Sequence, residues 1–299
     1  MNCTYHYPAI SLKITDLVNG YDACQFAVDQ GRTFWGHMLV DNACIRVALT
    51  NGHPDLVAAG LGPFRAAVRA ELAGPDLWEL QLEGLEDGQV PAEVQYQGFY
   101  FGYDENGDGQ STDWHGFTKA REPVAILGRA EQMPFRVTWD TSMLPAQNQA
   151  AVCAVVRFRS QTNLIYVTPA RGGIEIKPRA NRHVTLYASH DLPQPFWSRA
   201  GQKRACSINL DVDPASIEHA ELHVNAWTGG PGGIKDYFRI NGVAFPVAEG
   251  SRHELVYSRL DVKPEILVKG LNRIELLSDT EHHGIEILLP GPCLMIRSK

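Results

Sequence analysis

The clearest structural signal is the stretch PFRVTWDTS at residues 134–142, followed by AVCAVVRF at residues 151–158. Both stretches are rich in β-branched and aromatic residues, and the first alternates between apolar and polar side chains. Such alternation is typical of a β-strand, because successive side chains of a strand point to opposite faces of the sheet. These two stretches therefore predict two β-strands.

The same pattern extends over most of the chain from Phe64 onward, with turn residues about every eight to twelve positions. The first block of predicted strands is 64–72, 78–83, 92–103, 123–129, 135–140, 150–159, 164–168 and 173–177. The second block is 184–189, 205–212, 219–226, 236–240, 243–247, 252–258, 272–278, 284–289 and 293–297. We expect an all-β fold of tandem β-sandwiches with little helix.

Length supports more than one domain, because 299 residues exceed the usual size of one compact domain. We predict an N-terminal segment or small lobe at 1–55, a first sandwich at 56–178 and a second at 179–299. Residues 44–50 look like a further strand. Residues 56–69 are rich in alanine, but Gly60, Gly62 and Pro63 interrupt a helical period, which favours a strand from residue 64. Short helical turns are predicted at 213–216 and 263–266, where a proline follows a capping-type residue.

Charge and hydropathy limit the classes of partner. The formal net charge is −7 and no run of Lys or Arg is present, which disfavours nucleic acid. No apolar run approaches the roughly 20 residues that a transmembrane helix needs. The start, MNCTYHYP, has neither the basic nor the apolar region of a signal peptide. We expect a soluble protein, either cytosolic or, if a signal peptide was removed, extracellular.

The six cysteines form no CxxC pair, which excludes a zinc ribbon. Cys206 and Cys293 fall in an early and in the last predicted strand of the second sandwich. They could form a disulfide, or they could be two buried thiols, and buried thiols are the commoner case because free cysteine behaves as a small apolar residue.

The two predicted sandwiches resemble different modules. Residues 134–142 and 151–158 are similar to the late strands of bacterial immunoglobulin-like domains, a resemblance that covers roughly residues 60–178. The second block carries YFRING at 237–242, LNRIEL at 271–276 and GIEIL at 284–288. These segments resemble the jelly-roll modules attached to glycoside hydrolases and polysaccharide lyases, where Asn-Gly hairpins and Gly-x-Asn turns recur. The resemblance implies a carbohydrate-associated setting rather than a specific activity.

The segment 104–115, DENGDGQSTDWH, carries the strongest chemical signal. Oxygen-bearing side chains stand at its first, third and fifth positions and a glycine stands at the sixth, as in an EF-hand-type calcium loop. His115 takes the place of the usual glutamate at position twelve, so the loop is not a complete EF-hand. The predicted Ca²⁺ ligands are Asp104, Asn106, Asp108, Gln110 and Asp113. The alternative is an exposed acidic hairpin loop without an ion.

Several other side chains are candidates for ligand binding. Trp114 and His115 adjoin the acidic loop, and Trp227 heads a glycine-rich segment that ends at residue 233. A second exposed aromatic pair is expected at Phe196 and Trp197, since aromatic faces stack on sugar rings, although ordinary packing between strands is the commoner role of such residues. His282, beside carboxylates and in the same domain as several other histidines, could join a metal or acid–base site, against the alternative of a turn histidine.

Three functions remain open from the sequence. We expect first a calcium-stabilised protein that binds glycan or a cell-surface partner. The alternatives are a polysaccharide lyase or glycan hydrolase with its cleft between the sandwiches, using His and Tyr or paired carboxylates, and a structural or assembly module.

Overall fold

The computed structural model describes residues 10–18, 20–25, 45–85, 90–102, 127–159, 161, 164–193, 195–229, 233–251, 254–279 and 284–299. Over these residues the fold is all-β, as predicted. Helix is limited there to the five-residue α1 (Pro54–Ala58) and to three 3-10 turns, which are η1 (Ile14–Asp16), η2 (Pro214–Ser216) and η3 (Pro264–Ile266). The turns η2 and η3 confirm the helical turns predicted at those positions. In the part described, no helix is long and apolar enough to cross a membrane.

Eight strands between residues 67 and 176 form two sheets, which we call the N-terminal sandwich. The three-stranded sheet has the order β1 (Ala67–Leu72), β2 (Leu77–Glu83), β5 (Arg136–Asp140). The five-stranded sheet has the order β4 (Gly128–Ala130), β3 (Pro91–Phe99), β6 (Gln147–Phe158), β7 (Ile165–Val167), and β8 (Arg171–Ile176) also pairs with β6. Both sheets contribute buried apolar residues to one core, among them Leu80, Tyr96 and Trp139.

Ten strands between residues 183 and 298 form a second pair of sheets, the C-terminal sandwich. The six-stranded sheet contains β9 (His183–Ala188), β10 (Trp197–Ser198), β12 (Ile217–Thr228), β15 (Glu254–Asp261), β17 (Ile285–Ile287) and β18 (Cys293–Ser298). The four-stranded sheet has the order β11 (Lys203–Leu210), β16 (Gly270–Leu277), β13 (Phe238–Ile240), β14 (Val243–Ala244). Leu222, Phe238 and Ile274 belong to the core shared by these sheets.

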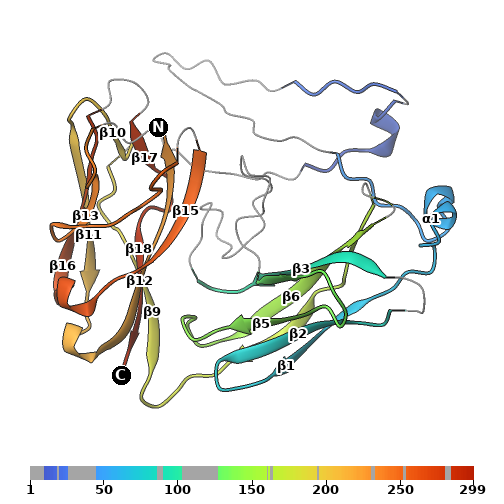
Figure 1. The fold of residues 1–299 in the computed structure, drawn as a ribbon, viewed down its shortest axis with the longest axis horizontal. Coiled ribbons are helices and arrows are strands. Elements are labelled where there is room, and N and C mark those ends of the chain that lie inside the picture. Colours follow the sequence, from blue (N-terminus) through green and yellow to red (C-terminus); the bar gives the residue numbers. More distant parts are fainter. Residues whose placement is uncertain are drawn as a thin grey trace.

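Strand β12 is the longest element of the six-stranded sheet. It pairs with β15 on one side, and with β17 and β18 on the other. Figure 1 shows the six-stranded sheet on the side of the C-terminal sandwich that faces the N-terminal sandwich. The domain boundaries at 55/56 and 178/179, and the immunoglobulin-like and jelly-roll identities, stay predictions.

The Asn-Gly hairpin predicted in the second block is present between β13 and β14. Asn241 and Gly242 have φ angles of 50° and 85°, and β13 pairs with β14 in antiparallel register on either side of them. Both central residues of this tight turn therefore have positive φ, which is why asparagine and glycine occupy them.

The region before the first sandwich differs from the prediction. Residues 45–50 form no strand, and Ile45 and Val47 are about half exposed. Residues 54–58 form α1, a helix that the prediction did not include. Pro54 stands at the start of this helix, and the His53 side chain accepts a hydrogen bond from the Asp55 amide, so the helix is capped locally. The predicted strand then begins at residue 67 rather than 64.

Other predicted strands are shorter than expected. Strand β14 ends at Ala244 rather than at residue 247. After Ala244 the chain leaves the strand, and the side chains of Phe245 and Val247 are buried. Strand β3 ends at Phe99, and the predicted strand at 123–129 is described only from residue 127, where β4 begins at Gly128.

Cys206 and Cys293 are both buried free thiols, so the structure has no disulfide between them. Burial raises the pKa of the Cys206 thiol to about 12, which keeps it protonated and unreactive at neutral pH. Burial likewise raises the pKa of Cys153 to about 11. These thiols act as small core residues.

Candidate functional site

The outward face of β12 carries a row of polar and aromatic side chains. Ala220, Leu222, Val224 and Ala226 belong to the core cluster of the C-terminal sandwich. Because side chains alternate along a strand, the residues between them lie on the opposite face of the sheet. These outward residues are Glu221, His223, Asn225 and Trp227, and the first three are nevertheless buried. We call this surface, with the outward side chains of the adjoining strands, the β12 face.

Aromatic side chains stand at one end of the β12 face. Trp227 on β12 lies opposite Glu286 on β17, and Glu286 lies opposite Trp197 on β10. Directly opposed residues share a face, so the two indoles flank one carboxylate along a line across three strands. The strand spacing places the two tryptophan backbones about 10 Å apart. All three side chains are half-buried, and the Arg199 guanidinium lies 4.4 Å from the centre of the Trp197 ring, which adds a cation–π contact.

A chain of hydrogen bonds occupies the middle of the β12 face. Glu221 Oε2 lies 3.0 Å from His223 Nε2, and His223 Nδ1 lies 2.5 Å from the Tyr257 hydroxyl oxygen. An ionised carboxylate can only accept hydrogen bonds, so Nε2 carries a proton and donates to Glu221. In the neutral imidazole Nδ1 then accepts from the Tyr257 hydroxyl. The arrangement aligns a phenol, an imidazole and a carboxylate, which are the groups of an acid–base relay.

Glu221 stays ionised although it is only 4% exposed. Burial alone would raise the pKa of its carboxyl, but the hydrogen bond from His223, the charge of Arg259 and the hydrogen bond from His219 outweigh burial, so the pKa lies below its usual value. Its carboxylate oxygen Oε1 lies 3.7 Å from Arg259 Nε and 3.3 Å from His219 Nε2. The β12 face thus holds a fixed negative charge beside hydrogen-bond donors.

Most of the site residues predicted from the sequence lie outside the described residues. These are Asp104, Asn106, Asp108, Gln110, Asp113, Trp114, His115 and His282. Trp227 is described, but it was expected to head a loop and instead is the penultimate residue of β12. The expected exposed pair at Phe196 and Trp197 is also wrong in part, because Phe196 is 4% exposed and packs in the core while Trp197 is half-buried.

The sequence did contain the signal for the β12 face. From Ala220 to Trp227 it reads AELHVNAW, in which small or apolar residues alternate with Glu, His, Asn and Trp. A half-buried strand with an ordinary solvent face would carry such varied polar side chains as well, so alternation by itself does not mark a site. The partners Tyr257, Arg259 and Glu286 come from distant strands, and only the pairing of β12 with β15 and β17 brings them together.

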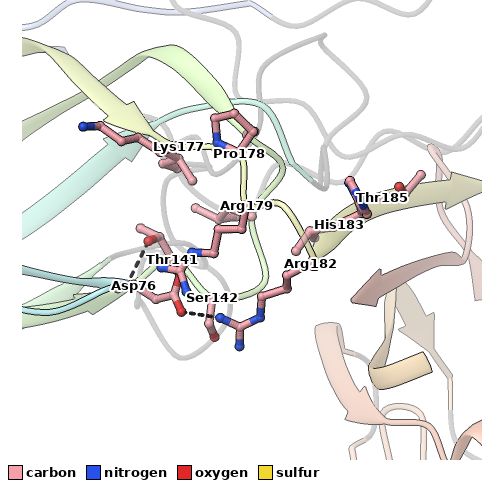
Figure 2. A pocket seen from close by; sticks show the side chains of 13 residues that line it. Asp76, Thr141, Ser142, Lys177, Pro178, Arg179, Arg182, His183 and Thr185 are labelled. Carbon is pink, nitrogen blue, oxygen red and sulfur yellow. Dashed lines mark hydrogen bonds and ion pairs between the residues drawn. The ribbon is translucent and has the colours of Figure 1, made fainter. Parts of the chain in front are cut away.

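A pocket at the segment between the sandwiches has a structural explanation. Figure 2 shows Arg179 and Arg182 converging on Asp76, which belongs to the turn between β1 and β2. The Asp76 carboxylate lies 2.5 Å from an Arg179 nitrogen and 2.6 Å from an Arg182 nitrogen, and its backbone carbonyl accepts a hydrogen bond of 2.9 Å from the Thr141 hydroxyl. Since both guanidinium groups are engaged by the carboxylate, these contacts fasten the chain after β8 to the N-terminal sandwich.

No protein-family model matches the sequence, and no curated protein matches it either. Among solved structures, the chain is similar to a glycoside hydrolase of family 86 in complex with neoagarooctaose, at 13% identity and a TM-score of 0.32, over 78% of this chain and 33% of the other. A β-porphyranase of the same family from the human gut bacterium Bacteroides plebeius matches at 14% identity and a TM-score of 0.32, over 78% and 36%.

An infectious bursal disease virus structure matches at 10% identity and a TM-score of 0.22, over 78% of this chain and 57% of the other. The chain spans about a third of the length of the two glycoside hydrolases. At these TM-scores the similarities carry no argument about fold or function.

Proposed function

We propose that the protein binds a glycan on the β12 face. The observation that carries this proposal is the row Trp197, Glu286 and Trp227 across β10, β17 and β12. Indole faces offer apolar area to the faces of sugar rings, and a carboxylate between them accepts hydrogen bonds from hydroxyl groups.

Binding fits the β12 face better than a purely structural role. Structural sheet faces that are covered are usually apolar, whereas this one buries a charged carboxylate, an imidazole and an amide side by side. Keeping such groups ordered away from water costs free energy unless each has partners. A face of this kind is suited to a polar ligand with many hydroxyl groups, such as a glycan. The sequence resemblance to a jelly-roll module of carbohydrate-active proteins agrees with this proposal.

Removing the two indoles tests glycan binding directly. We expect the wild-type protein to retain at least one glycan on an array, and Trp197→Ala and Trp227→Ala each to weaken that binding by at least about tenfold, or about 1.4 kcal/mol. Tyr21→Ala serves as the control, because Tyr21 is an aromatic residue that is 81% exposed and lies outside both sandwiches. Undiminished binding by a folded double tryptophan variant would place the glycan elsewhere.

We further propose that residues 104–113 bind Ca²⁺ and that the ion stabilises the protein. The support is the sequence pattern, in which Asp104, Asn106 and Asp108 precede Gly109 and are followed by the further predicted ligands Gln110 and Asp113. Ligand binding to the native state raises the free energy of unfolding by about 2.7 kcal/mol when the free ion stands at 100 times its Kd. We expect melting curves to shift upward with Ca²⁺ and downward with a chelator, and Asp108→Ala to abolish the difference. Identical curves in both conditions would mean an acidic turn without an ion.

Glycan cleavage is a second candidate function, favoured by the hydrogen-bonded chain of Tyr257, His223 and Glu221. Held by Glu221, the His223 imidazole is placed to take the Tyr257 proton, which would leave a phenolate base toward a bound sugar. If the protein cleaves the glycan that it binds, Tyr257→Phe is expected to abolish the release of new chain ends while glycan retention on the array persists. If wild type releases no new chain ends from any retained glycan, the protein is a binding module.

A further inference from the structure

We propose that His219, Glu221 and Asp261 form a binding site for a divalent transition-metal ion such as Zn²⁺. His219 and Glu221 are two positions apart on β12 and therefore share a face of the sheet. Asp261 stands on β15 directly opposite Glu221 in the strand register. The backbone pairing thus brings one imidazole and two carboxylates to one end of the β12 face, where Glu221 stands six residues before Trp227 of the tryptophan row.

The separations between the ligand atoms match a metal site. His219 Nε2 lies 3.3 Å from Glu221 Oε1 and 3.5 Å from Asp261 Oδ1, and the three ligand atoms all lie within 4.8 Å of one another. In tetrahedral zinc sites, bonds of about 2.0–2.1 Å to nitrogen and oxygen separate neighbouring ligand atoms by about 3.3–3.4 Å. Two of the three edges therefore have nearly the required length, and the third is no longer than 4.8 Å and involves the exposed side chain of Asp261.

The surroundings of Glu221 orient it for this role. Its second oxygen, Oε2, is held at 3.0 Å by His223 Nε2, and His223 is held in turn by Tyr257. Because His223 holds Oε2, the other carboxylate oxygen, Oε1, lies on the side of His219 and Asp261. Ligating carboxylates in metalloproteins are commonly fixed by such outer hydrogen bonds, which raise affinity because the ligand is ordered before the ion arrives. The buried Glu221 is thus a fixed ligand, whereas His219 and Asp261 are accessible to an ion from solvent.

Charge also favours a cation at this position. Two carboxylates and a neutral imidazole would balance one divalent ion, and three protein ligands would leave a coordination position for water or for a ligand oxygen. Arg259 is the nearby competitor, since its Nε lies 3.7 Å from Glu221 Oε1. Its side chain is 65% exposed, so it can move toward solvent when an ion binds. The same contact predicts that removing the arginine charge strengthens metal binding.

Zinc titration of the tag-free, full-length protein tests the site. The protein is first stripped with a chelator and then titrated with Zn²⁺ against a zinc-binding dye, in excess Ca²⁺ so that any calcium sites stay filled. We expect one Zn²⁺ per chain, at least tenfold weaker binding for His219→Gln and for Asp261→Asn, and several-fold tighter binding for Arg259→Gln. Co²⁺ should give the visible absorption of a four-coordinate ion in wild type and lose it in His219→Gln.

The variants are chosen to keep the fold, because Asp261 and Arg259 are exposed and His219 is about one-third exposed. His190→Gln is the matched control, since His190 is an exposed histidine outside the cluster. Zinc binding that is equal in wild type, His219→Gln and Asp261→Asn would overturn the proposal and assign the ion to other residues. So would the absence of zinc binding in wild type, which would leave His219 as an ion-pair partner of the two carboxylates. Neither result bears on the tryptophan row, so glycan binding is judged separately.

Discussion

Replacing Asn272 by alanine is expected to lower the free energy of unfolding by about 3 kcal/mol, the cost of leaving several buried polar groups without partners. Asn272 lies on β16 and is 0% exposed. Its Oδ1 accepts hydrogen bonds from the Val268 amide at 2.9 Å and from Asn241 Nδ2 at 2.8 Å. Its Nδ2 donates to the carbonyl oxygens of Val268 at 2.8 Å and Gly270 at 3.0 Å. All four hydrogen-bonding positions of the amide are therefore satisfied.

The position of these hydrogen bonds in the fold explains why their loss lowers the free energy of unfolding. Asn272 links the turn before β16 to Asn241 in the β13–β14 hairpin, and Asn241 Oδ1 accepts a hydrogen bond of 2.8 Å from the Arg273 amide. Alanine would leave the Val268 amide and carbonyl, and part of the Asn241 side chain, without their hydrogen-bond partners. Aspartate is nearly isosteric, but it cannot donate and would place a charge in the core, so Asn272→Asp is expected to be at least as destabilising at neutral pH.

Urea denaturation of both variants measures the effect. Asn209→Ala is the matched control, because Asn209 is exposed on β11, the strand that pairs with β16, and its replacement should change stability by less than about 0.5 kcal/mol. A loss for Asn272→Ala as small as that of the control would mean that the turn before β16 does not depend on the amide.

Features of the fold that depend on local chemistry were predictable from the sequence. The hairpin at Asn241 and Gly242 followed from two residues that tolerate positive φ. The turn η2 followed from a proline after the capping residue Asp213, whereas at η3 the proline alone carried the signal, because Lys263 makes no side-chain cap hydrogen bond. The strands of the sandwiches followed from period-two alternation, which reflects only the side of the sheet that each residue faces. The segment 271–276, which carries the jelly-roll resemblance, contains Asn272, but the importance of this residue comes from its side-chain hydrogen bonds. Gly270, which has a φ of 96°, supplies the backbone geometry.

The candidate site was not predictable in the same way. Glu221, His223 and Trp227 lie on a strand that was predicted, yet their partners stand about 30 to 60 residues later in the sequence. Whether Tyr257 or a neighbour of it meets His223 depends on the register of β15 against β12, and a shift of one residue would turn Tyr257 to the other face. The glycines after Trp227 dominate the local sequence pattern and predict a loop at this residue. Strand pairing extends β12 through Thr228 in spite of them.

Gly284→Ala is expected to have the second large effect, because no side chain fits where β10 meets β17. A Cβ atom at Gly284 would lie 2.0 Å from the Ser198 carbonyl oxygen and 2.9 Å from the Arg199 Cβ. Its φ of 31° is also one that residues with a side chain rarely adopt. Moreover, the Gly284 carbonyl accepts a hydrogen bond of 2.9 Å from the Gly229 amide, so the glycine is held from the β12 side as well.

Strand β10 cannot simply move away to relieve this clash. Ser198 is 0% exposed, and its hydroxyl accepts a hydrogen bond of 2.9 Å from the Ser278 amide at the end of β16. Phe196, two residues before Ser198, packs in the core. Pushing β10 outward would break these contacts, so we expect Gly284→Ala to lower the free energy of unfolding by about 2–4 kcal/mol. It should also displace Trp197, which lies between these two anchored residues.

Measuring both stability and glycan binding shows whether Gly284 only stabilises the fold or also positions Trp197. Gly172→Ala is the control, since a Cβ there meets no atom within 4 Å and its φ is not in the left-handed region. If Gly284→Ala loses stability and also binds glycan more weakly than expected from its folded fraction, the glycine sets the position of Trp197 in the tryptophan row. If stability falls while binding by the folded fraction is unchanged, Gly284 does not set the position of Trp197 in the tryptophan row. Unchanged stability would mean that β10 has room to move, against the contacts that hold Ser198 and Phe196.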